Sequence, residues 1–105
     1  MGPYSGRASK QEFSFHMVGW GASTGEASSP LRSLLATVNR DKGLGAVNWG
    51  RYSNAKVDYG VEQAIQQVDD ENRRAMLQQA TKLAMDDLGI MPVHFQYTIW
   101  ATKKG

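Results

Sequence analysis

The sequence contains no cysteine and only two histidines among its 105 residues. The absence of cysteine excludes disulfides, thiolate nucleophiles and Cys-ligated zinc or iron–sulfur sites. His16 and His94 each lie inside an alternating apolar stretch, with no carboxylate at ligand spacing, so we expect structural histidines and no bound metal. No cofactor is expected either, because Gly19-Trp20-Gly21 lacks the lysine and the glycine spacing of a phosphate-binding loop.

Excess charge and long apolar runs are also lacking. Twelve Lys and Arg against ten Asp and Glu leave a net charge of +2, which is too little positive charge to predict a nucleic-acid partner. No apolar run approaches the roughly 18–20 residues that span a bilayer, and the polar start of the chain predicts no secretory signal within it. With 41% apolar and 21% charged residues, the composition predicts one ordinary globular unit.

Two stretches of alternating apolar residues predict β-strands, because side chains on a strand point to opposite faces in turn. They cover residues 13–20 and 92–100. The apolar side of the first holds Phe13, Phe15 and Met17, and that of the second holds Val93, Phe95, Tyr97 and Ile99. Residues 1–12 are polar and are predicted to form an extended arm ahead of the first strand.

Three helices are predicted between these strands. Ser29 and Pro30 suit the N-cap and the first position of one helix, Asp58 suits the cap of a second, and residues 69–71 place negative charge at the start of a third. The order strand-helix-helix-helix-strand predicts an α/β fold over residues 13–105. Because two strands cannot cover three apolar helix faces, we expect further polypeptide or self-association to cover them.

The loop that follows the first strand is the best candidate site on residue types alone. Trp20 is a large flat side chain beside small hydroxylated residues, on a loop that leaves the carboxyl end of a strand. That composition is common in ligand walls of α/β proteins. A packed tryptophan followed by an ordinary loop explains it equally well.

Several motifs, taken in order, resemble one protein family. They are the Gly19-Trp20-Gly21 strand end, the run from Arg51 to Asn54 followed by Val57-Asp58, the acidic-capped helix with Arg73-Arg74, and the run from Gly89 to Gln96 with Trp100 beyond it. Together they resemble the C-terminal portion of the peptide/nickel class (family 5) of extracytoplasmic solute-binding proteins of ABC importers. The resemblance extends from about Tyr4 to Gly105.

The resemblance implies a fragment of one lobe of a two-lobed periplasmic binding protein. Residues 13–105 would supply the later part of the second lobe and end in the hinge strand. The implied function is non-catalytic capture of a peptide or other small solute, with an ABC permease as partner of the full-length parent. The resemblance also implies that this parent is periplasmic.

The resemblance also implies the site residues. Trp20, Gly21, Ala22, Ser23 and Thr24 would form a wall of the ligand cleft. Ser23 stands where peptide-binding members carry an aspartate that pairs with the α-ammonium of the ligand. A neutral hydroxyl cannot form that ion pair, so we do not expect this loop to hold a free amino terminus, and Glu26 is the nearest carboxylate that could replace the aspartate.

Two other functions are left open by the residues. One is a small self-associating protein-interaction module, which would pair its strands and pack its exposed apolar stripes between copies. The other is a small hydrolase that uses serine and histidine. It has the least support, because no Gly-x-Ser-x-Gly elbow marks a nucleophile, and no enzyme activity is expected.

Overall fold

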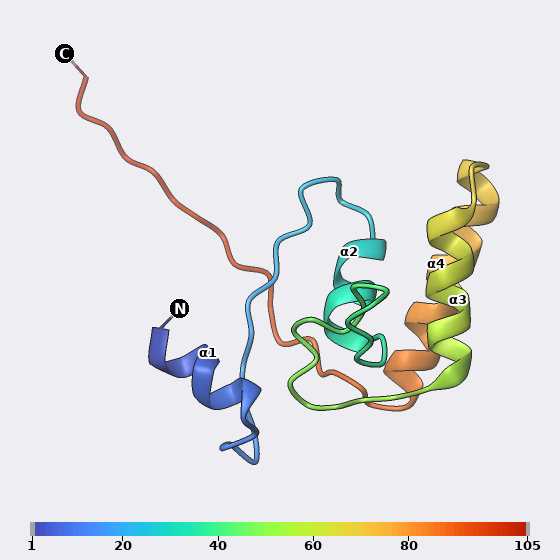
Figure 1. Ribbon diagram of the computed structural model, residues 1–105. Coiled ribbons are helices and arrows are strands. Elements are labelled where there is room, and N and C mark those ends of the chain that lie inside the picture. The colour runs from blue at the N-terminus through green and yellow to red at the C-terminus, as the bar shows by residue number, and fades with distance from the viewer. Residues whose placement is uncertain (1, 105) are drawn as a thin grey trace.

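The computed structural model describes residues 2–104 as a set of helices joined by long loops (Figure 1). The elements are α1 (Gly2–Ser9), α2 (Ser28–Pro30), the π-helix η1 (Leu31–Leu35), α3 (Ala55–Gln66) and α4 (Asp70–Asp86). Within these residues the one β-type backbone contact is an isolated antiparallel bridge between Asn39 and Leu44. The predicted α/β class, strand-helix-helix-helix-strand, is therefore wrong, because the described chain is helical and has no strand.

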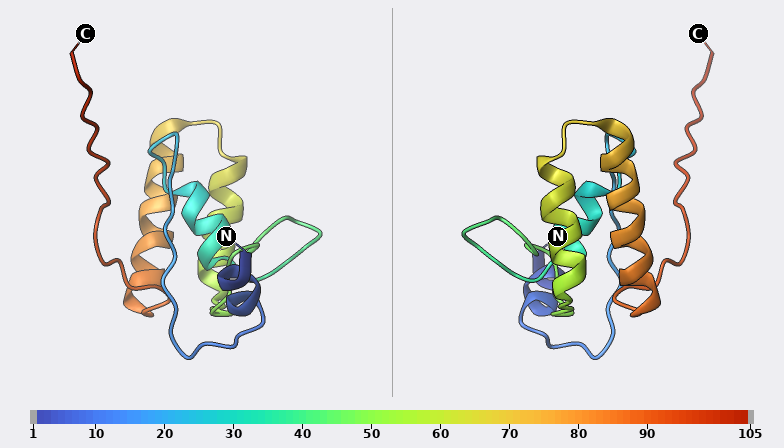
Figure 2. Two further views of the ribbon diagram at one scale, coloured as in Figure 1. Left: turned by 90° about the vertical axis from the view of Figure 1, so that its left-hand side faces the viewer. Right: turned by 90° about the vertical axis from the view of Figure 1, so that its right-hand side faces the viewer.

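Helices α3 and α4 lie side by side and form the main body of the molecule (Figure 2). Gly60 permits their close approach, since a Cβ atom at this position would lie 3.3 Å from the Cβ atom of Ala80. Helix η1 packs against both helices and completes the core. The buried core residues are Leu31, Leu34 and Leu35 from η1, Val57, Val61 and Ala64 from α3, and Leu77, Ala80 and Ala84 from α4.

The helix starts follow local capping rules in part. Asp69 caps α4, because its carboxylate accepts a hydrogen bond of 2.8 Å from the backbone N–H of Asn72, as the acidic run predicted. Asn54, not Asp58, caps α3, and its side-chain oxygen accepts from the N–H of Lys56 at 2.8 Å. The prediction of Asp58 as a cap is wrong because its carboxylate accepts instead from the N–H of Thr37 at 2.8 Å.

The predicted helix after Ser29 is shorter and differently wound than expected. Its cap is Ala27, which makes no side-chain cap bond, so Ser29 lies inside α2 and does not cap it. The backbone N–H of Ala36 donates to the carbonyl of Leu31 at 2.8 Å, the i to i−5 spacing of a π-helix. At Ala36 the backbone becomes extended, with ψ of 143°, and the helix ends.

The N-terminal part also differs from the prediction. Residues 2–9, expected in an extended arm, form α1. The hydroxyl of Tyr4 accepts from the N–H of Met17 at 2.9 Å and donates to its carbonyl at 2.6 Å. This contact holds the chain at Met17 against α1, and the strand predicted over residues 13–20 is absent.

The C-terminal segment, residues 91–104, is extended and leaves the helical body (Figure 1). None of its backbone groups makes a hydrogen bond to another described residue. The alternating side chains of Val93, Phe95, Tyr97 and Ile99, here called the apolar row, are 67%, 90%, 86% and 91% exposed. The strand predicted over residues 92–100 is therefore absent, because no described segment pairs with this stretch through backbone hydrogen bonds. No helix within residues 2–104 is long and apolar enough to cross a bilayer.

Candidate ligand-binding site

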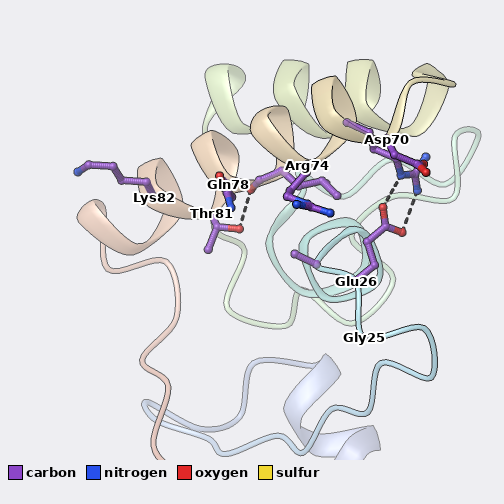
Figure 3. A pocket seen from close by; sticks show the side chains of 10 residues that line it. Gly25, Glu26, Asp70, Arg74, Gln78, Thr81 and Lys82 are labelled. Atoms are coloured by element: carbon purple, nitrogen blue, oxygen red, sulfur yellow. Dashed lines mark hydrogen bonds and ion pairs between the residues drawn. The ribbon is translucent and has the colours of Figure 1, made fainter.

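A hollow of about 550 Å³ lies between α4 and the loop that leads into α2 (Figure 3). We call it the α4 hollow. The loop contributes Gly25, Glu26 and Ala27, and α4 contributes residues from its first turn at Asp70 to Lys82. Residues 20–24, which the resemblance marks as a cleft wall, come directly before this part of the loop.

Helical periodicity explains why these α4 side chains share one face. Arg74, Gln78 and Lys82 follow one another at intervals of four, and residues four apart on a helix lie one above the other. A second row at the same interval contains Arg73, Leu77 and Thr81, all of which line the hollow. The two adjacent rows give α4 a mixed face in which buried Leu77 supplies the apolar floor.

An ion pair between Glu26 and Arg73 closes one end of the hollow. The Nε and Nη2 atoms of Arg73 donate to the two carboxylate oxygens of Glu26, the second bond being 3.0 Å long. Nη1 of the same guanidinium donates to the carbonyl of Ala64 on α3 at 3.1 Å. One arginine therefore fixes the loop against both long helices.

The same contacts set the charge of Glu26. Hydrogen bonding from Arg73, and then from the hydroxyl of Ser28 at 2.9 Å, lowers the pKa of the Glu26 carboxyl group. The carboxylate is thus ionised at neutral pH, but Arg73 already neutralises it. The sequence left open that Glu26 could bind the ammonium group of a ligand. The ion pair with Arg73 makes Glu26 unavailable for that role.

Arg74 is the unpaired cation of this face. Its side chain is exposed and makes no hydrogen bond or ion pair to another residue in the described range. Lys82, by contrast, donates to Asp86 at 2.6 Å. A guanidinium can bind a carboxylate through two parallel hydrogen bonds, so the α4 hollow offers one anion-binding group beside the apolar surface of Ala27 and Leu77.

The five site residues predicted from the sequence lie together on one exposed loop, but none of them lines the α4 hollow. The indole N–H of Trp20 donates to the hydroxyl of Ser29 at 3.2 Å, so its ring lies along α2. Ser23 and Thr24 occupy a turn closed by a 3.0 Å bond from the N–H of Gly25 to the carbonyl of Ala22. The loop reaches the hollow immediately after this turn, at Gly25.

The histidines lie apart from this hollow. His16 is close to the ring of Trp49, with 5.8 Å between ring centroids, and His94 is exposed on the C-terminal segment. Within residues 2–104 no group of three or more His, Asp or Glu side chains is arranged to hold a metal ion.

Comparison of the chain with protein-family models, with curated protein sequences and with solved structures finds no match. The functional argument therefore uses the residues and the geometry described above.

Proposed function

We propose that this chain takes part in the non-catalytic capture of a peptide or another small solute for an ABC importer, as part of an extracytoplasmic receptor of the peptide/nickel class. The α4 hollow is the observation that carries the proposal. It adjoins residues 20–24, which the resemblance implies as a cleft wall, and it combines an unpaired guanidinium with an apolar floor.

The chemistry of the hollow favours a ligand with a carboxylate and an apolar part. Arg74 can bind the carboxylate of a peptide. Leu77 and Ala27 can contact apolar side chains of the same peptide. Such surfaces accept many side chains of similar size, because they offer few directional groups. This tolerance suits a receptor for solutes of variable sequence.

The exposed apolar row further supports the proposal that another polypeptide covers part of this chain. Contiguous apolar patches of this kind mark surfaces that another protein surface covers. In a receptor with two closing lobes, a ligand is buried from both sides. The α4 hollow would be one side only, so we expect weak binding by this chain alone, with a dissociation constant on the order of 1 mM.

Nuclear magnetic resonance titration with the tripeptide Ala-Leu-Ala tests the proposal. The amide signals of Gly25, Glu26 and Ala27 and the side-chain signal of Arg74 are expected to shift together in the millimolar range. Arg74→Ala should weaken binding roughly 3- to 10-fold, as loss of one exposed ion pair does. Arg40→Ala is the matched control, because Arg40 is exposed and lies outside the hollow.

The C-terminal amide of the same tripeptide provides a second control, since it lacks the carboxylate. It should bind wild-type protein as weakly as the acid binds Arg74→Ala. Equal binding of the acid and the amide would contradict the role of Arg74. A dissociation constant in the micromolar range would contradict a one-sided site, and no shift at about 10 mM peptide would contradict the proposal as a whole.

A further inference from the structure

The apolar row begins at the edge of a second hollow, which it shares through Val93. This hollow, of about 470 Å³, is here called the aromatic hollow. Its apolar lining includes Phe15, Val18, Ile90, Met91 and Val93. Val93 belongs to both features, because it is also the first residue of the apolar row.

The backbone of the C-terminal segment is free to pair with another strand. Its N–H and C=O groups make no hydrogen bond within the described chain, and an open strand edge is a template for pairing with a second chain. Residues 92–102 contain no Asp, Glu, Lys or Arg. Two copies can therefore pair through this stretch without placing like charges opposite each other.

Charge decides the direction of such pairing. In a parallel pair, Lys103 and Lys104 would each lie beside the same residue of the other copy, and like charges at that distance are unfavourable. In an antiparallel pair, these lysines would extend toward the end of α4 in the other copy. Asp86 and Asp87 lie at that end and already accept bonds from Lys82 and Tyr52 of their own copy, so the antiparallel direction removes the repulsion between the lysines.

The alternation of apolar residues restricts the register to those that set the two apolar rows on one face, and full overlap of the rows selects one of these registers. Directly opposed residues of an antiparallel pair lie on the same face. Pairing Gln96 with Gln96 of the second copy sets Val93 opposite Ile99 and Phe95 opposite Tyr97, so that both apolar rows share one face. A shift by one residue would place the two apolar rows on opposite faces, and a shift by two would leave one end of each row without an apolar partner.

We propose that two copies of this chain associate through antiparallel pairing of residues 92–100, with Gln96 on the twofold axis. The interface is isologous, because each copy gives and receives the same contacts. It also places Ile99 of each copy beside Val93 of the other, at the mouth of the aromatic hollow. The hollow thereby covers the far end of the apolar row of the second copy. The inference concerns the 105-residue chain and does not depend on what the α4 hollow binds.

Cysteine cross-linking measures the register directly, and the chain offers a clean background since it has no native cysteine. Gln96→Cys, His94→Cys and Thr98→Cys all lie on the polar side of the alternation, so each leaves the apolar row intact. Under mild oxidation, Gln96→Cys should form disulfide-linked dimers at least about tenfold faster than either other variant. Residues 94 of the two copies would lie about 13 Å apart, and a disulfide requires Cβ atoms about 4 Å apart. A mixture of His94→Cys and Thr98→Cys should cross-link to the mixed dimer, because these positions oppose each other.

Each other outcome overturns the proposal. Equal rates at positions 94, 96 and 98 would indicate parallel pairing, and fastest linkage at 94 or at 98 would indicate another register. Sedimentation of the unmodified chain should show a mass that rises with concentration, and Phe95→Lys should abolish the rise while Gln66→Lys, at an exposed position on α3, should not. A constant mass of one chain up to about 1 mM would exclude the dimer.

Discussion

The guanidinium of Arg73 binds the carboxylate of Glu26 through two hydrogen bonds, although 47 positions separate them in the sequence. Both side chains are partly shielded from solvent, with 26% and 32% of their surface exposed. Because Arg73 also binds the Ala64 carbonyl, one side chain joins three segments. This relationship holds the loop of the α4 hollow in place.

Replacement of Glu26 by glutamine should destabilise the fold in a pH-dependent way. The folded-state pKa of Glu26 is lowered, chiefly by the bond from Arg73. A lowered pKa means that the stabilisation is present above the pKa of the unfolded chain and is lost as the pH falls through the folded pKa. Urea unfolding should therefore separate wild type from Glu26→Gln at about pH 7 and bring them together below the usual carboxyl range.

The control for this pH series is Glu71→Gln, in the exposed first turn of α4. Glu71 makes no ion pair with a described residue, so its replacement should change the unfolding free energy by no more than about 0.5 kcal/mol. A difference between wild type and Glu26→Gln that stays constant as the pH falls would show that the ion pair does not cause it.

Asn48→Ala should be among the most destabilising single substitutions. Asn48 is 4% exposed, and its amide donates to the carbonyls of Ala36 and Tyr52 at 3.0 and 2.7 Å while accepting from the Tyr52 N–H at 3.0 Å. Alanine leaves these backbone groups without partners, at an expected cost of about 2–4 kcal/mol. Chemical unfolding measures the change in the free energy of unfolding. Asn72→Ala is the control, because Asn72 is exposed and its replacement should cause no loss of stability. A loss below about 1 kcal/mol for Asn48→Ala would contradict this account.

Local rules in the sequence predicted the features that depend on neighbouring residues. Residues 69–71 mark the start of α4 because capping and the helix dipole act within one turn. The alternation at residues 92–100 predicted a strand, and that prediction is wrong because this stretch has no regular secondary structure. Alternation could not predict a sheet, since a strand needs hydrogen-bond partners from elsewhere and the described chain supplies none.

Features that depend on distant contacts were missed for the same reason. Asp58 is a residue type that often caps helices. Its carboxylate instead accepts a hydrogen bond from the backbone N–H of Thr37, 21 positions away. Likewise, the predicted site ended at Thr24, just before the residues that line the α4 hollow. Arg74 could be placed in that hollow only once the packing of the loop on α4 was known, although its spacing with Gln78 and Lys82 was visible in the sequence.

Two glycines with the same backbone conformation should respond differently to alanine. Gly25 and Gly45 have φ of +67° and +65°, but a Cβ atom at Gly45 would lie 2.5 Å from the Ala36 carbonyl oxygen, whereas one at Gly25 meets nothing within 4 Å. Gly25→Ala should cost about 1 kcal/mol of left-handed strain. Gly45→Ala should cost at least about 3 kcal/mol, because the backbone must also move. Urea unfolding compares them, and equal losses would contradict the steric difference.

Tyr52 should ionise only in strongly alkaline solution. Burial, and then the 2.7 Å hydrogen bond that its hydroxyl donates to Asp87, raises the pKa of Tyr52 from 10.0 to about 12. A raised pKa means that the stabilisation is complete below the pKa of the unfolded chain and is lost as the pH rises through the folded pKa. Stability should therefore decline between about pH 10 and pH 12, and the decline should be smaller in Tyr52→Phe.

Phenolate absorbance separates Tyr52 from the other tyrosines. The difference between the titrations of wild type and Tyr52→Phe should have its midpoint near 12, while the difference for Tyr59→Phe, whose side chain is exposed, serves as the control. Asp87→Asn should lower the pKa of Tyr52 but leave it above 10.0, because burial is the larger cause and remains. A Tyr52 midpoint at the ordinary value in wild type would mean that the loop carrying Tyr52 does not pack beside the end of α4.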